Sequence, residues 1–153
     1  MDHLRKTGAR HRGAHPRSLE GMEGIRRYFA WAGFRAPDLI LHVIETDDQL
    51  REIVRAFLVD FADLSLPVER PARAHRYEQL QVPSDLFRHV LRFGLSWEEL
   101  GIGVEARLFR APEGHTFDFW SHFQHQLPAR PLPWNEPAND VDASALLLSV
   151  RPG

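Results

Sequence analysis

Cysteine is absent from the 153 residues of this chain. Disulfide bonds, cysteine nucleophiles and every metal site that uses a thiolate are therefore excluded. The absence also fits a reducing compartment and predicts a cytoplasmic protein. Lysine is nearly absent too, because eighteen of the nineteen basic residues are arginine. This bias is common where coding DNA is rich in G and C, so it predicts a bacterial source.

Long apolar segments are also lacking. The longest apolar runs, LILHVI and ALLLSV, are far shorter than the ~20 residues that a membrane-spanning helix requires. The N-terminal residues are polar and basic, without the apolar segment of a signal peptide. We therefore expect no membrane association. No motif of high specificity for a reaction or ligand is present, so function must be inferred from weaker patterns.

The first twenty residues differ in charge from the rest of the chain. They contain five basic and two acidic residues, a net charge of +3, which leaves −5 for the remainder of a chain whose total is −2. We expect a disordered basic tail over residues 1–20 and a single domain over residues 21–153. A basic arm can bind nucleic acid by releasing counterions from phosphates, which gives one alternative function. Dispersed charges without aromatic residues among them favour a passive tail.

The spacing of apolar residues predicts the secondary structure of the domain. Apolar positions three and four residues apart indicate helices, and alternation indicates strands. The predicted elements are a helix at 24–32, a strand at 39–45, a helix at 47–64, a weak strand at 76–82 near a sheet edge, a short helix at 84–93, strands at 103–111 and 116–124, and a last strand at 144–150. This order predicts an α+β fold, a single domain with helices on one face of a mostly antiparallel sheet of four or five strands.

A capping box marks the start of the helix predicted at 47–64. Thr46 and Gln49 have the spacing at which two side chains satisfy free amide groups in the first helical turn. Asp47 and Asp48 suit the positive end of the helix dipole. The apolar stripe that follows consists of Leu50, Ile53, Val54, Phe57, Leu58, Phe61 and Leu64.

The two segments at 103–111 and 116–124 predict a β-hairpin around the sequence Pro-Glu-Gly-His. Both alternate between apolar and polar residues, and proline and glycine suit a tight turn between them. An even loop length places Leu108 across from Phe119 on an apolar inner face, whereas an odd one would mix the two faces.

The same register defines the outer face of the hairpin. Arg107 is expected opposite Trp120, and Glu105 opposite His122. A carboxylate beside an imidazole orients the ring and raises its basicity. The pair is therefore a candidate acid/base site, and an ordinary cross-strand pair is the simpler alternative.

The segment TFDFWSHFQH and its preceding residue contain three histidines and an aspartate, which could suggest a metal site. In a strand, His122 and His125 point to opposite faces, because their separation is odd. Asp118 and His122 share a face but lie roughly 13 Å apart along the strand, too far to bind one ion. His115 faces away from both. We therefore predict no metal site here and no cofactor.

Protein binding through the exposed sheet face is the function that these patterns favour. The chain is small, its body is acidic and no coherent catalytic set is visible, as in an adaptor, an inhibitor or an immunity protein. Tryptophan and arginine are the residues that most often anchor interfaces. The expected binding residues are Trp120, Arg107, Asp118, Phe109 and, in the proline-rich loop at 126–140, Trp134.

A small enzyme is the alternative. Its cleft would lie between the outer sheet face and the loop at 126–140, with His122 as the general base and Glu105 as the residue that orients it. The sequence leans against this function, because no nucleophile, phosphate-binding loop or second acid is visibly paired with His122.

Overall fold

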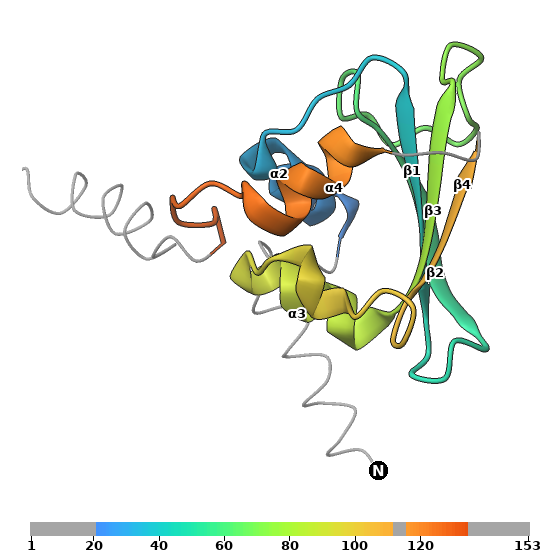
Figure 1. The fold of residues 1–153 in the computed structure, drawn as a ribbon, viewed down its shortest axis with the longest axis vertical. Coiled ribbons are helices and arrows are strands. Elements are labelled where there is room, and N and C mark those ends of the chain that lie inside the picture. The colour runs from blue at the N-terminus through green and yellow to red at the C-terminus, as the bar shows by residue number, and fades with distance from the viewer. Residues whose placement is uncertain (1–20, 112–115, 135–153) are drawn as a thin grey trace, which may run out of the picture.

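The computed structural model describes residues 21–111 and 116–134. In this part of the chain a four-stranded sheet carries three α-helices on one of its faces (Figure 1). The elements are α2 Met22–Ala32, β1 Leu39–Thr46, β2 Ile53–Asp60, β3 Arg76–Pro83, α3 Ser84–Phe93, the 3₁₀ helix η1 Trp97–Leu100, β4 Arg107–Ala111 and α4 Phe117–His125. The α+β prediction, with helices on one face, is confirmed. The tail at 1–20 and the strand expected at 144–150 lie outside the described residues.

The sheet has the strand order β2-β1-β3-β4. β1 pairs antiparallel with β2 and parallel with β3, and β3 pairs antiparallel with β4. The sheet is therefore mixed, although most of its pairings are antiparallel as expected. The strand expected near an edge, β3, lies inside the sheet between β1 and β4. None of the described helices is both long and apolar enough to cross a membrane.

The prediction of a helix at 47–64 is wrong, because this segment completes a hairpin with β1. The carboxylate of Asp47 accepts hydrogen bonds from the amides of Gln49 and Arg51 and so closes a turn. β2 follows, with Phe57 and Val59 buried against the helices. Apolar residues in this segment satisfy both helical and strand spacing, and β-branched side chains favour the strand.

The prediction of a hairpin at 103–124 is also wrong. β4 pairs with β3 instead, and the second half of the segment forms helix α4. A helix buries Phe119, Trp120 and Phe123 together, whereas a strand would send Trp120 to the face opposite the two phenylalanines. Burial of three aromatic side chains on one side therefore outweighs the alternation that suggested a strand.

Aromatic side chains fill the space between the sheet and the helices. The largest fully buried ones are Trp97, Tyr28, Phe29, Phe61, Phe87, Phe119 and Phe123. Trp97 lies centrally: its ring centroid is 4.5 Å from that of Phe123 and 5.6 Å from that of Phe119. Its indole nitrogen donates a hydrogen bond of 2.8 Å to the hydroxyl of Tyr28. Burial raises the pKa of Tyr28, which keeps this hydroxyl protonated.

Glycine ends both α2 and α3 in the left-handed backbone conformation, with φ of 78° at Gly33 and 61° at Gly94. The two positions differ in the space around them. A Cβ atom on Gly94 would lie 2.9 Å from Cη2 of Trp31 and 3.1 Å from Cδ1 of Leu132. A Cβ atom on Gly33 would meet nothing closer than 3.9 Å. Gly94 is therefore required for close packing as well as for its backbone conformation.

We expect Gly94→Ala to destabilise the protein more than Gly33→Ala. Both substitutions place a side chain in the left-handed region, at a cost of about 1–2 kcal/mol. Gly94→Ala adds overpacking against Trp31, which costs about 1–3 kcal/mol more. Urea unfolding of both variants measures the difference, and equal free energies of unfolding would contradict the packing role of Gly94.

Candidate functional site

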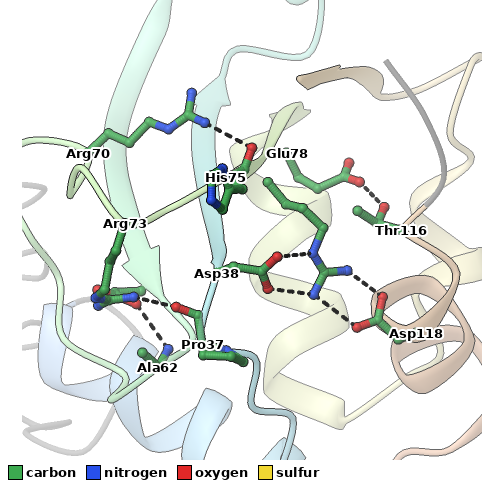
Figure 2. A network of polar contacts seen from close by, with 11 residues as sticks. Pro37, Asp38, Ala62, Arg70, Arg73, His75, Glu78, Thr116 and Asp118 are labelled. Carbon is green, nitrogen blue, oxygen red and sulfur yellow. Dashed lines mark hydrogen bonds and ion pairs between the residues drawn. The ribbon is translucent and has the colours of Figure 1, made fainter. Parts of the chain in front are cut away.

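A buried carboxylate lies on the helix-facing side of β3. Glu78 alternates with Leu80 and Val82, which belong to the core, and its own exposed fraction is 0%. Its cross-strand partner on β4 is Arg110, whose Nε lies 3.3 Å from Oε1 of Glu78. The hydroxyl of Thr116, the residue before α4, donates a hydrogen bond to the same oxygen (Figure 2). Glu78 is therefore held between the edge strand and the start of α4.

Burial sets the ionisation of Glu78. It raises the pKa of the carboxyl group because the charged form loses its hydration, and interactions with Thr116, Arg110 and the indole N–H of Trp120 oppose the rise. Oε2 of Glu78 and Nε1 of Trp120 are both buried, and neither has a hydrogen bond of good geometry among the described residues. A buried carboxyl group with a perturbed pKa and unsatisfied neighbours is typical of a functional site.

A cleft of about 310 Å³ lies between β4 and α4, beside this carboxylate. Arg110 and Trp120, the two side chains that adjoin Glu78, also line the cleft. The complete lining among the described residues is Ile102, Leu108, Arg110, Phe117, Trp120, Ser121, Gln124 and His125. Its volume is that of a small-molecule site, and it combines apolar walls with a few polar groups.

Arg76 fixes the position of α4 over the sheet. The guanidinium group lies between the carboxylates of Asp38 and Asp118, with N–O distances of 2.7–3.1 Å. Asp118 belongs to the first turn of α4, and Asp38 directly precedes β1. Arg76 lowers the pKa of both aspartates, so the network remains charged over a wide pH range. It therefore joins the start of two strands to the helix that covers Glu78.

A second buried carboxylate, Glu45, provides a comparison. It accepts hydrogen bonds from Ser84 at 2.8 Å, from Arg55 at 2.7 Å and from Arg88 at 3.2 Å. Both of its oxygens are therefore paired. This arrangement compensates the buried charge and leaves neither oxygen without a partner, in contrast to Glu78.

The predicted binding residues do not form one surface. Trp120 is 7% exposed and packs against Trp97, so its expected position on an outer sheet face is wrong. Asp118 lies on α4 in its ion pair with Arg76. Phe109 is exposed on the sheet face away from the helices, and Arg107 shares that side of β4.

Trp134 was expected to be exposed in a proline-rich loop, and the structure places it at the edge of the core. Its ring stacks on Tyr28 with a centroid distance of 6.3 Å. Its indole nitrogen donates a hydrogen bond to the carbonyl oxygen of Arg92. Only part of the side chain remains accessible, so it joins this loop to α2 and α3.

The expected pair of Glu105 and His122 does not form. Nε2 of His122 donates to the carbonyl oxygen of Ala32, the last residue of α2, and the ring packs against Phe34. Glu105 lies in an exposed loop before β4, where it lines a different hollow together with Arg107. The pair cannot act as acid and base, because each side chain belongs to a different part of the fold.

Glu78 was missed, although the sequence contained a signal for it. In the strand at 76–82, Glu78 shares a face with Leu80 and Val82, so a carboxylate was already predictable on an apolar face. Thr116 and Arg110 could not have been assigned to it, because the predicted hairpin paired β4 with the wrong segment. Among the described residues, no group of three or more histidines and acidic residues is placed to hold a metal ion.

The fold and site define a small α+β domain with a ligand-sized cleft beside a buried carboxylate. Over 112 residues, 72% of this chain, it is 44% identical to the cytidine monophosphate-N-acetylneuraminic acid hydroxylase of Xenopus laevis. It is 46% identical over the same length to the hydroxylase of Macaca mulatta and to the human protein, which is named inactive. No family model and no solved structure matches the chain.

The chain spans about a fifth of the length of these curated relatives, from 19% to 22%. The names of the relatives describe an enzyme, so the prediction of an adaptor, inhibitor or immunity protein is wrong. The enzyme alternative agrees better with them, although its predicted pair of residues is not formed. The relatives are vertebrate proteins, and this contradicts the bacterial source inferred from arginine usage.

The pH dependence of stability tests the burial of Glu78. Because its pKa is raised in the folded state, the folded protein binds this proton more tightly than the unfolded chain. The stabilisation is full below the ordinary pKa of glutamate, about 4.3, and is lost as the pH rises through the raised value. Glu78→Gln removes the titration, so the stability of wild type relative to this variant should fall as the pH rises from about 4 through the raised pKa.

The measurement is urea unfolding of both proteins across this pH range. Glu69→Gln, at an exposed position, controls for the loss of one negative charge. A difference between wild type and Glu78→Gln that stays constant with pH would rule out a raised pKa at Glu78.

Proposed function

We propose that this chain is the counterpart of one domain of a sugar-nucleotide hydroxylase, of the kind named cytidine monophosphate-N-acetylneuraminic acid hydroxylase. The observation that carries the proposal is the identity of 44–46% over 112 residues. An identity this high extends beyond what a shared fold alone requires. We assign the hydroxylase activity to the longer polypeptide, and we regard this domain as the counterpart of one part of that polypeptide.

Within that enzyme, we assign this domain to holding the substrate. Hydroxylation of a carbon atom is a two-electron oxidation, for which enzymes use a redox cofactor or metal, and the surrounding protein binds and orients the substrate. The cleft between β4 and α4 has the size and mixed lining of such a binding site. The domain would therefore contribute affinity and orientation, and the oxidising centre would be contributed by other parts of the enzyme.

The human relative supports this division of roles. It is named inactive, yet it is as similar to this chain as the macaque enzyme is, at 46% identity over 112 residues. Possession of this region is therefore not sufficient for hydroxylation. This is expected when a region binds substrate and another part of the protein performs the oxidation. A cytoplasmic location, which the lack of cysteine favours, remains part of the proposal.

A chimeric enzyme tests the proposal. In the macaque hydroxylase, the matched region is replaced by the 112 corresponding residues of this chain. We expect the chimera to hydroxylate cytidine monophosphate-N-acetylneuraminic acid with a loss in kcat/KM of less than about tenfold, or about 1.4 kcal/mol. Mass spectrometry detects the product by its added oxygen atom.

Two matched proteins control this experiment. The unmodified macaque enzyme gives the reference rate, and a version without the region shows whether the region is needed. A chimera that folds with the thermal stability of the parent enzyme but forms no product would refute the proposed function.

A further inference from the structure

The walls of the cleft between β4 and α4 differ in chemical character. Phe117, in the first turn of α4, is 65% exposed and lines the cleft together with Trp120. Ile102 and Leu108 supply further apolar surface. Flat aromatic and apolar surfaces of this kind bind planar rings, and stacking of a nucleic-acid base on an aromatic side chain is tolerant of sequence and geometry.

The ionisable side chains that line the cleft favour an anion over a cation. Arg110 and His125 are its ionisable residues, and no carboxylate is among the lining residues that the structure describes. Glu78 is not among the lining residues, and its carboxylate contacts Nε of Arg110, which lines the cleft. A third of the Arg110 side chain remains exposed, at 33%. A guanidinium group has five N–H donors, so one contact with Glu78 leaves others for a phosphate group.

Two polar side chains that could recognise a base edge also line the cleft. Ser121 and Gln124 line the cleft on α4, one and two turns after Phe117.

We propose that the cleft between β4 and α4 binds the cytidine monophosphate part of a sugar nucleotide, with the base on Phe117 and the phosphate beside Arg110. The class of ligand, an anionic nucleotide, follows from the lining of the cleft. The choice of cytidine rests on the function proposed above.

Calorimetric titration of the full chain with cytidine monophosphate tests this site. We expect saturable binding at one site, and Phe117→Ala should weaken it by about 5- to 150-fold, the factor expected for loss of base stacking. His125→Ala should weaken it less, because His125 ends α4, eight residues or roughly 12 Å along the helix from Phe117. Phe117 and His125 are exposed, so neither substitution removes core packing.

Matched substitutions on α3 serve as controls. Phe93 is 52% exposed and His89 is exposed, and neither lines the cleft. Phe93→Ala and His89→Ala should therefore bind cytidine monophosphate as wild type does. Cytidine and inorganic phosphate, titrated separately, should each bind more weakly than the nucleotide, and uridine monophosphate measures the preference for the base.

Three results would overturn the inference. They are no binding of cytidine monophosphate by the folded chain, equal affinity in Phe117→Ala and Phe93→Ala, and inorganic phosphate binding as tightly as the nucleotide.

The nucleotide site and the proposed function can be refuted independently of each other. An active chimera whose KM is unchanged by Phe117→Ala refutes the site alone. Binding that depends on Phe117, together with an inactive chimera, refutes the function and retains the nucleotide site.

Discussion

The packing of α4 against the aromatic core is the interaction on which the rest of the structure depends. Phe119 and Phe123 lie 4.7 Å apart between ring centroids, and Phe123 meets Trp97 at 4.5 Å. This contact determines that the segment is a helix and places it over the sheet. Thr116 and Trp120 are thereby brought to Glu78, and the cleft beside β4 acquires its second wall.

The helix-facing side of the sheet contains two fully buried carboxylates, Glu45 and Glu78, and their surroundings differ. Glu45 is paired through both oxygens, which is how a buried charge is stabilised when its role is structural. Glu78 has one oxygen without a hydrogen bond among the described residues and a raised pKa. A protein tolerates such a group at a cost in stability, and groups of this kind cluster at functional sites.

The failure of the predicted binding surface has a structural basis. A surface centred on Trp120 required the hairpin, and this side chain instead packs against Trp97 and lines a cleft at its margin. The same aromatic and arginine residue types that anchor protein interfaces also bind nucleotides. Their arrangement in a concave site, rather than on a flat face, agrees with relatives that are named as enzymes acting on a sugar nucleotide.

By itself the sequence determined the elements whose signals are local. The helices near 24–32 and 84–93 and the strand at 39–45 follow from spacing and end residues over a few positions. Tertiary structure decided the secondary structure of residues 53–60 and of α4. The apolar residues of both segments fit the spacing of a helix and that of a strand, and contacts with residues distant in sequence select one of the two. Tertiary structure also decided the site, since Glu78, Arg110 and Thr116 are distant in sequence, and their contacts exist only when β4 joins β3 and α4 covers both.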